Sequence, residues 1–570
     1  MQAHRPSELL SKARLSRRKL LAGAGAALGA ASVAGLAVRN QTNAAREPQT
    51  GTSPATPNPL SATPIPGEVT QYAKDWPVAQ GDLQSTRAAN GSPINASNLS
   101  KLAVAWSTPI TATGGFGGMT ANPVVLGQTI YLQDMQSNVY ALDRDTGKEI
   151  WRTDFKVPSN GPNGVAVAYG YVFAATGDTS TAFALDAKTG KTVWLAKLSN
   201  NDYENIDMAP TVYDNTVYIS TNPNNVTNGN YRGGARGILY ALDAATGKTL
   251  WDFDTATDNL WGNPRVNSGA GVWYPPSVDD QGNLYFGTGN PGPYPGNDQF
   301  PNGASRPGPN DYADSLVSLD PASGAVRWSV NANPHDLFDH DLQASPVLAT
   351  VTLNQTPTLI AVGSGKTGTV VAADAKTGAL LWKTAVGKHQ NDQLQELPPG
   401  VTEIYPGGLG GVESPLAFGD GKIFAPYIDF PQYLTPTKSD SSPHGSLADA
   451  SGGLAAIDAA TGVIAWDTKI NAIVTAGATV VNDVVLAPAL DGYLRAYDIK
   501  TGKQVWEMQT PAGINAPLAV AGDMIVFAAA APFFVPSPQS GATPAASSSG
   551  ATPAPAPKVN PQVVALKLGS

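Results

Sequence analysis

The segment VYALDRDTGKEIW, residues 139–151, is the first of seven related segments that set the architecture of this chain. Its alternating apolar residues predict a strand, and Asp-x-x-Thr-Gly predicts a turn in which Gly takes a positive φ. A second strand then ends in Trp. The other six copies end at Trp194, Trp251, Trp328, Trp382, Trp466 and Trp506.

Most copies follow another pair of short apolar strands, such as ANPVVLGQTIYLQD, residues 121–134. The unit is therefore a four-stranded antiparallel sheet whose Trp packs against its neighbour, and such repeats are typical of a β-propeller. An eighth Trp ends LAVAW, residues 102–106, while the C-terminal QVVALKLGS supplies a strand and turn without a Trp strand. We expect an all-β, eight-bladed β-propeller closed by N- and C-terminal strands in one blade. An open β solenoid would leave this complementarity unexplained.

The composition agrees with many strands and turns and excludes several functions. Charged residues are only 14% and hydrophobic residues 42%, with 59 Gly and 47 Pro. A net charge of −9 offers no basic face to nucleic acid or to an anionic membrane. The absence of cysteine excludes disulfides, thiolate metal sites and a covalently attached haem.

The N-terminal residues 1–44 have the pattern of a twin-arginine export signal. Arg17 and Arg18 precede a weakly apolar stretch, and small residues at Thr42 and Ala44 permit cleavage. A membrane anchor is the alternative, but Ala and Gly contribute little transfer free energy. We expect a periplasmic or extracellular protein with no membrane span after signal removal. Residues 45–70 form a Pro/Thr-rich linker, and residues 71–570 form the propeller with a low-complexity insertion at 531–558.

The octapeptide PHDLFDHD, residues 334–341, gathers three aspartates in a sparsely charged chain. Residues i and i+2 of an extended segment project to one side, so Asp339 and Asp341 can reach one hard cation such as calcium. The alternatives are a solvated acidic turn or bonds to loop amides, and we assign Asp336 to a turn. His335 and His340 have no third histidine nearby for zinc, so we expect them to pack within the loop.

The motif ALDAKTGKxxW resembles the blade motif of the quinoprotein alcohol dehydrogenases, eight-bladed propellers that bind pyrroloquinoline quinone (PQQ). Residues 75–106 and 328–348 look like two longer signatures of that family, and the second contains the octapeptide. The resemblance implies an alcohol or sugar dehydrogenase that uses PQQ and a Ca²⁺ or lanthanide ion. Because the chain has no haem motif, electrons would pass to a separate acceptor such as a cytochrome.

The resemblance also implies roles for single residues. It assigns Asp339 as the catalytic base and Asn290, Asp339 and Asp341 as metal ligands, with Asp341 matching the lanthanide-using branch. It places Trp273 under the flat PQQ ring system and Lys366 at the quinone oxygens, where a cation stabilises developing negative charge. The structural alternatives are a turn former for Asn290, a core residue for Trp273 and a surface residue for Lys366.

Several features of the family are absent from this sequence. VPSNGPN, residues 157–163, stands where the family has an adjacent cysteine pair, and its Asn163 replaces a PQQ-binding arginine. Arg232 stands in the place of a metal-binding glutamate, although Arg cannot ligate a metal. Glu413 either replaces the lost carboxylate or pairs with Arg232. These departures keep a second function open, a non-catalytic propeller similar to the periplasmic scaffold that assists outer-membrane protein assembly.

Overall fold

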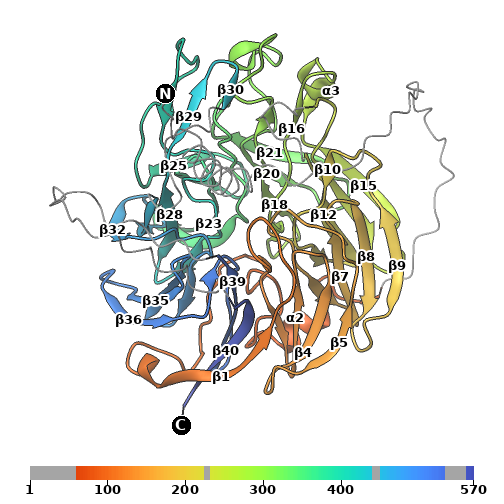
Figure 1. Ribbon diagram of the computed structural model, residues 1–570, viewed down its shortest axis with the longest axis vertical. Coiled ribbons are helices and arrows are strands. Elements are labelled where there is room, and N and C mark those ends of the chain that lie inside the picture. The colour runs from red at the N-terminus through yellow and green to blue at the C-terminus, as the bar shows by residue number, and fades with distance from the viewer. Residues whose placement is uncertain (1–59, 224–231, 440–449, 533–559, 570) are drawn as a thin grey trace, which may run out of the picture. The chain divides into compact units, whose positions relative to one another are not determined.

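The computed structural model describes residues 60–223, 232–439, 450–532 and 560–569. The export signal, most of the expected linker and nearly all of the expected insertion lie outside these residues. The unit from Ser61 to Ser570 contains eight antiparallel sheets of four strands, one of them extended by a short fifth strand, arranged around a ring (Figure 1). In the described part of the chain, no helix is long and apolar enough to cross a membrane.

The first four blades follow the chain without interruption. Blade 1 contains β2 (Val124–Leu126), β3 (Thr129–Gln133), β4 (Val139–Asp143) and β5 (Glu149–Thr153). Blade 2 contains β6 (Ala166–Ala168), β7 (Tyr171–Thr176), β8 (Thr181–Asp186) and β9 (Thr192–Lys197). Blade 3 contains β11 (Thr211–Tyr213), β12 (Thr216–Ser220), β14 (Ile238–Asp243) and β15 (Thr249–Asp254). Blade 4 contains β17 (Ser277–Val278), β18 (Leu284–Gly287), β20 (Ser315–Leu319) and β21 (Val326–Asn331).

The remaining blades repeat the same order of strands. Blade 5 contains β22 (Val347–Leu353), β23 (Thr356–Gly363), β24 (Thr369–Asp374) and β25 (Leu380–Ala385). Blade 6 contains β27 (Ala417–Gly419), β28 (Lys422–Asp429), β31 (Ser451–Asp458) and β32 (Ile464–Ile470). Blade 7 contains β33 (Thr479–Val481), β34 (Val484–Pro488), β35 (Tyr493–Asp498) and β36 (Gln504–Gln509). Blade 8 contains β38 (Ala519–Ala521), β39 (Met524–Ala531), β40 (Gln562–Leu568) and β1 (Leu102–Pro109), with β37 (Gly513–Ile514) also paired to β39.

Blade 8 joins the two ends of the chain, which confirms the expected closure of the ring. Strands β1 and β40 are antiparallel, with Leu102 opposite Leu568 and Pro109 opposite Gln562. First strands such as β2, β6 and β33 are wholly buried, whereas the Trp strands β9, β15 and β36 expose at least half of their residues. The first strands therefore face the inside of the ring, and the Trp strands form its rim (Figure 1).

At seven of the eight junctions between blades, the repeated Trp joins one blade to the next by a hydrogen bond. The Nε1–H of Trp151 donates to the carbonyl of Ala187 at 3.0 Å, and six other blade tryptophans repeat this bond. The glycine of the neighbouring turn lies against the indole, so that a Cβ at Gly190 would be 2.5 Å from Trp151 Cε3. Two features therefore require glycine at these turns. The backbone has a left-handed φ (69° at Gly190), and a side chain would collide with the indole of the neighbouring blade.

The segment of residues 76–89 crosses the ring and bonds to several blades. Its carbonyls accept from Val278, Leu348, Phe418 and Val480, which begin or adjoin the first strands of blades 4 to 7. The guanidinium of Arg87 is fully buried, and its partners are Gln80, Asn122, Thr479 and the carbonyls of Ala478 and Leu518. Burial among these neutral acceptors lowers the pKa of Arg87 to about 9.

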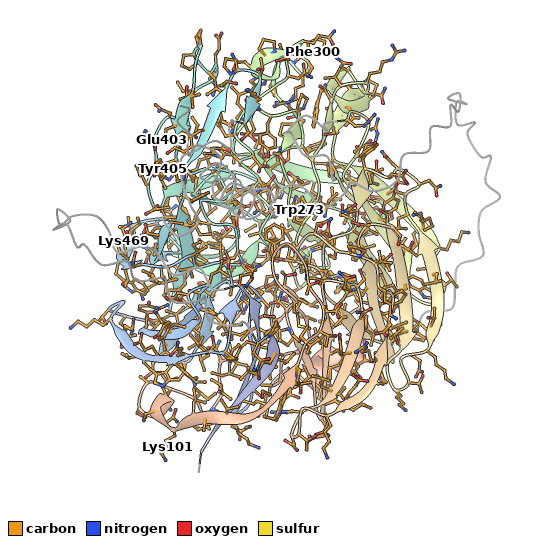
Figure 2. The ribbon with its side chains drawn as sticks, viewed as in Figure 1. Lys101, Trp273, Phe300, Glu403, Tyr405 and Lys469 are labelled. Carbon is orange, nitrogen blue, oxygen red and sulfur yellow. The ribbon has the colours of Figure 1, made fainter. Side chains whose placement is uncertain are left out.

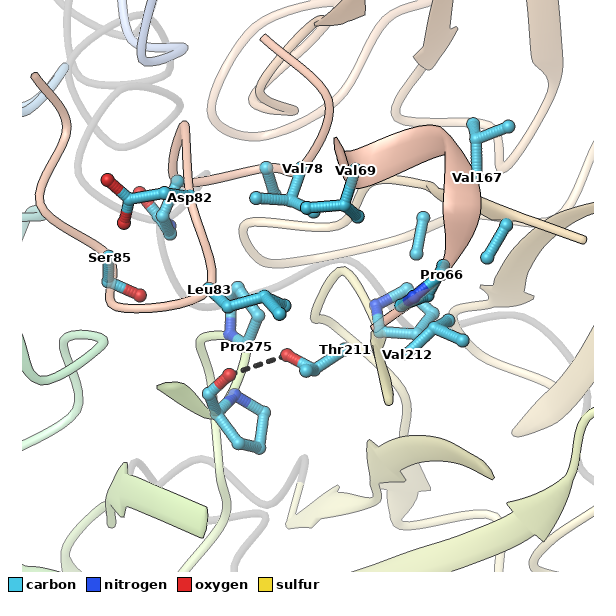
Figure 3. Close-up of a pocket in the computed structure, with 16 residues that line it drawn as sticks. Pro66, Val69, Val78, Asp82, Leu83, Ser85, Val167, Thr211, Val212 and Pro275 are labelled. Atoms are coloured by element: carbon cyan, nitrogen blue, oxygen red, sulfur yellow. Dashed lines mark hydrogen bonds between the residues drawn. The ribbon is translucent and has the colours of Figure 1, made fainter. Parts of the chain in front are cut away.

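A hollow lies where this segment meets blades 2 and 3 (Figure 3). It is lined largely by apolar and proline side chains, among them Val69, Val78 and Leu83, with one hydrogen bond from Thr211 to the carbonyl of Pro276. The helix α2 (Gly67–Gln71), at the end of the expected linker, lies beside it. The hollow contains none of the candidate site residues, so it does not locate the chemistry.

The long connections that lead into blades 4 and 6 and cross within them carry most of the remaining short elements. The first holds α3 (Thr257–Trp261), the pair β16 (Ser268–Gly269) and β19 (Pro291–Gly292), and the 3-10 turn η2 (Pro301–Gly303). The second holds the sheet β26 (Thr402–Ile404), β29 (Gln432–Thr435) and β30 (Lys438–Ser439). A further pair joins β10 (Glu204–Asn205) to β13 (Asn222–Pro223), and η1 (Leu99–Lys101) precedes β1.

Candidate functional site

The octapeptide follows β21 and leads towards blade 5, and Asp336 fixes its shape. The Asp336 carboxylate accepts from Asn333 Nδ2 at 3.0 Å, from the amide of Phe338 at 2.8 Å and from the amide of His340 at 2.9 Å. Asp336 is therefore the turn residue that the sequence indicated. Leu337 and Phe338 pack into a small apolar cluster with Leu397, Ile404 and Leu434.

The two histidines of the octapeptide pack within the loop and make hydrogen bonds to backbone. His340 Nε2 lies 2.9 Å from the carbonyl oxygen of Pro406, and His335 Nε2 lies 3.1 Å from that of Asn302. Each ring therefore holds a neighbouring connection in place, as expected for loop packing and not for a zinc site.

Asp339 and Asp341 meet at the ammonium of Lys366. Lys366 Nζ lies 3.1 Å from Asp339 Oδ2 and 2.8 Å from Asp341 Oδ2, and the three side chains expose only 16%, 15% and 3% of their surface. The two carboxylates therefore converge on the ammonium of Lys366, whereas the sequence argument expected them to converge on a metal ion. Asp339 has a left-handed backbone, with φ of 64°, so the segment is not the extended strand that we assumed. Lys366 is buried rather than at the surface.

Asn290 and Trp273 lie on the other side of Asp341. The amide of Asn290 donates to Asp341 Oδ1 at 2.6 Å, and Asn290 Nδ2 donates to the carbonyl of Pro291 at 3.3 Å. A Cβ at Gly289 would lie 2.9 Å from Trp273 Nε1 and 3.0 Å from Asp341 Oδ1. The edge of the indole and the carboxylate therefore both pack against Gly289. Figure 2 labels Trp273 towards the middle of the ring. All five candidate residues thus belong to one site.

The site contains more acidic groups than positive charge. Burial lowers the pKa of Lys366, but Asp339, Asp341 and Glu413 outweigh it and hold that pKa well above its usual value. Burial raises the pKa of Asp339 to about 8, against the effect of Lys366 and with a further contribution from Asp341. Burial likewise raises the pKa of Glu413 to about 7. Two carboxylates contact one ammonium and Glu413 adds a third acidic group to its field, so the site favours an additional cation.

Several buried polar side chains in the same part of the ring have no hydrogen-bond partner among the described residues. Asn222 Oδ1 lies close to Gly271, whose carbonyl accepts from Gly289 at 2.7 Å, and both amide atoms of Asn222 are unpaired. Ser364, Gln343 and Ser414 lie within two residues of Lys366, Asp341 and Glu413, and each has an unpaired side-chain oxygen. Unpaired buried groups are costly, so their concentration here indicates a place for a polar ligand.

A family model described as "Glucose/ethanol/alcohol dehydrogenase, beta-propeller domain" matches residues 76–393, more than half of the chain. The chain belongs to this family. It is a divergent member, since its curated quinoprotein relatives are about 26% identical. A second model, described as "Outer membrane protein assembly factor BamB", matches residues 447–540.

Three relatives illustrate the family. "Putative dehydrogenase XoxF" of Paracoccus denitrificans is 26% identical over 75% of this chain and 81% of that protein. The lanthanide-dependent methanol dehydrogenase of Methylacidiphilum fumariolicum is 26% identical over 60% of this chain and 62% of its own length. The quinohemoprotein alcohol dehydrogenase of Comamonas testosteroni is 26% identical over 55% of this chain, which spans only 48% of that relative.

Solved structures of the family share the fold. The quinohemoprotein alcohol dehydrogenase ADHIIG of Pseudomonas putida HK5 has a TM-score of 0.73 at 21% identity, over 90% of this chain and 83% of that one. A europium-containing methanol dehydrogenase has a TM-score of 0.70 at 20% identity, over 88% of this chain and 100% of that one.

The positions at which the chain departs from the quinoprotein dehydrogenases have local structural roles. Asn163 is buried, and its Nδ2 donates to the carbonyl of Asp134 at 2.8 Å. Arg232 is exposed and lies over the ring of Tyr203 at 5.6 Å, so it is not among the buried side chains around Asp341. Although Arg232 stands in the sequence where the family has a metal-binding glutamate, its exposed side chain does not bring a positive charge to Asp341. Glu413 contributes to the field at Lys366, after Asp339 and Asp341.

Sequence reasoning missed one group beside this site. Asp314 is fully buried, and neither of its carboxylate oxygens has a hydrogen-bond partner among the described residues. Burial, followed by the charges of Asp336 and Asp341, holds its pKa well above the usual value. Asp314 stands just before β20 and resembles an ordinary strand-flanking residue, so no local pattern could have revealed it.

Proposed function

We propose that this protein is an exported quinoprotein dehydrogenase that oxidises an alcohol or sugar hydroxyl with PQQ and a Ca²⁺ or lanthanide ion. One observation carries the proposal. Asn290, Asp339, Asp341 and Lys366 come from three distant segments, yet they meet in one buried site that Trp273 borders. A propeller that served only as a scaffold would not require these side chains to converge.

The side chains in this site fit the chemistry of a cation and of PQQ. The proposed donors are Asp339, Asp341 and the amide oxygen of Asn290, since no three acidic or histidine side chains of the described residues form a metal site by themselves. Hard oxygen donors with excess negative charge suit Ca²⁺ or a lanthanide ion. PQQ is an acidic quinone rich in acceptor oxygens, and Lys366 together with the unpaired hydroxyls of Ser364 and Ser414 supplies donors.

Each side chain then has a definite task. Asp339 takes the proton of the substrate hydroxyl at Oδ2 and so acts as the general base. The Lys366 ammonium provides the positive charge between Asp339 and Asp341 and keeps their carboxylates close together. Trp273 offers a flat wall beside Asp341 Oδ1. When bound, PQQ would accept the hydride from the carbinol carbon, with the cation polarising its quinone carbonyl.

The partners and location follow from the sequence. The chain has no cysteine for a covalent haem, so a separate acceptor such as a cytochrome would take the electrons. The twin-arginine pattern in residues 1–44 supports export of a folded, cofactor-loaded protein.

Reconstitution tests this function. Purified protein titrated with PQQ and Ca²⁺ or La³⁺ should bind the quinone, followed by its absorbance, and should reduce a dye with a primary alcohol. Asp339→Asn should lower dye reduction about 10²- to 10⁴-fold while PQQ stays bound. If PQQ does not bind with any of these metals, the proposal is wrong, and unchanged turnover in the variant removes Asp339 from the role of base.

A second candidate is the non-catalytic scaffold, which the match of residues 447–540 to the BamB model favours. That match covers less than a fifth of the chain and none of the candidate site residues. A scaffold would bind outer-membrane protein precursors without PQQ or metal, so the same titration separates the two functions.

A further inference from the structure

The turn of residues 365–368, which carries Lys366 into the site, is held on both sides. A backbone hydrogen bond of 3.0 Å between its two end residues closes the turn. On one side, the amide of Val412 donates to the first carbonyl of the turn at 2.9 Å, and a Cβ on Gly411 would lie 2.4 Å from the carbonyl oxygen of Lys366. Backbone atoms therefore fix this side of the turn.

A single side chain, that of His389, holds the other side. Gly368 has a left-handed φ of 64°, and a Cβ there would lie 3.1 Å from both Cε1 and Nε2 of His389. The turn leads into β24, and β25 ends just before Val386, whose amide donates to the carbonyl of Gly368 at 2.9 Å. His389 Nε2 lies 3.2 Å from the carbonyl oxygen of Val386. The imidazole therefore bridges the adjoining ends of β24 and β25, beside the turn that carries Lys366.

Both ring nitrogens of His389 face hydrogen-bond acceptors. Nδ1 lies 2.6 Å from Asp392 Oδ2, and Nε2 faces the carbonyl of Val386. A neutral imidazole has one N–H and can donate to only one of these acceptors, whereas the imidazolium donates to both. The arrangement therefore requires a positively charged His389. The hydrogen bond to Asp392, against the effect of burial, accordingly raises the pKa of His389.

Asp392 supplies the negative charge that stabilises this imidazolium. Burial opposes the ionisation of Asp392, but the bond and charge of His389, followed by the charge of His340, lower its pKa. His340 itself bonds through Nε2 to the carbonyl of Pro406. The other charged side chains on the neighbouring segments have contacts of their own, and these are Lys366, Lys388, Glu403 and Asp429.

We propose that His389 is a positioning residue for Lys366, an inference that rests on the proposed function where it concerns turnover. The imidazolium, held by Asp392, ties the end of the turn to the end of β25, while backbone bonds hold the beginning of the turn. Lys366 then has one fixed place, from which its ammonium reaches both carboxylates of the site. A neutral His389 leaves one of its two acceptors without a donor, so the turn loosens and the ammonium no longer bridges the carboxylates.

The pH profile of kcat/KM in the reconstituted protein tests this role. Asp392→Asn keeps an acceptor for His389 Nδ1 but removes the charge, so the imidazolium loses its proton at a lower pH. The alkaline fall of kcat/KM should therefore begin about one to two pH units lower in this variant, while the values below that fall stay close to those of the parent. A loss that is equal at every pH, without a shift of the fall, would show a purely structural role and overturn the proposal.

Asp491→Asn is the matched control. Asp491 pairs with Arg495 in blade 7, and the two side chains expose 10% and 13% of their surface, so this pair is buried to a similar extent as His389 and Asp392, at 23% and 6%. Its loss lowers stability without touching the turn, and the alkaline fall should stay where it is in the parent. A shift in this variant as well would contradict the assignment, because reduced stability would then explain both.

Two measurements need no turnover and therefore separate this inference from the proposed function. The NMR signal of His389 Cε1–H, assigned by its absence from His389→Gln, should titrate with a pKa above the ordinary histidine value, and with a lower one in Asp392→Asn. Crystals of His389→Gln should show Lys366 Nζ displaced from at least one of its two carboxylates. If Lys366 keeps both contacts, or if the pKa of His389 is ordinary, the positioning role is wrong. If both results hold but no alcohol is oxidised with any metal, the proposed function fails and the positioning role stands.

Discussion

Lys366 is the side chain whose substitution tests the candidate site most simply, because its ammonium contacts two carboxylates. It lies 3.1 Å from Asp339 and 2.8 Å from Asp341, and all three side chains are largely buried. Lys366→Met keeps the length of the aliphatic chain and removes the charge. Asp339 and Asp341 then face one another without a counter-charge, in a site that Glu413 already makes more negative.

The magnitude follows from the burial of the three groups. Removing one partner of a buried ion pair costs about 3–5 kcal/mol of the free energy of unfolding. Because Asp339 is partly exposed, we expect a loss of about 3 kcal/mol. The entropy of unfolding is roughly 2 cal/mol/K per residue, which for a chain of this size gives a fall in Tm of about 3 °C. Added La³⁺ should restore more stability to the variant than to the parent protein, because the ion replaces the lost charge.

The assay is calorimetric Tm together with urea unfolding followed by tryptophan fluorescence, each with and without La³⁺. The matched control is Lys422→Met, whose partner Asp420 lies 2.9 Å away but is 48% exposed, so its loss should stay within about 0.5 kcal/mol. Equal losses in the two lysine variants would refute the idea that Lys366 balances a buried acidic site.

Two further predictions concern the fold. Gly190→Ala should cost about 2–4 kcal/mol, because its Cβ would lie 2.5 Å from Trp151, whereas Gly170→Ala, also at a positive φ but in open space, should cost only about 1 kcal/mol. Urea midpoints measure both, and equal costs would contradict the interblade contact. The hydrogen bond that His389 Nδ1 donates to Asp392 Oδ2, 2.6 Å away, raises the pKa of His389 above its unfolded value. The pair therefore stabilises the fold below about pH 6.5 and loses this effect as the pH rises through the raised value. His389→Gln should therefore lower Tm more at pH 5.5 than at pH 9, and an equal fall at both would count against the pair.

The eight blades could be predicted because their information is local. Each copy of the motif contains its own strand, turn and Trp, and the contact of that Trp with the next turn is repeated around the ring. The closure of blade 8 also followed from the two incomplete ends, since a Trp strand and its missing partner were both visible in the sequence.

The site was predicted in its members but not in its geometry. The signature gave Asp339 and Asp341, yet the left-handed backbone of Asp339 depends on Asp336 and on loops far away in sequence. Position alone placed Arg232 in the site, whereas the structure places it at the surface over Tyr203.

The most direct test of the central claim is anomalous diffraction from crystals grown with PQQ and La³⁺. We predict one strong lanthanum peak within coordinating distance of oxygens of Asn290, Asp339 and Asp341, with the quinone beside Trp273 and Lys366. A fully soaked crystal with no lanthanum at these oxygens would contradict the account.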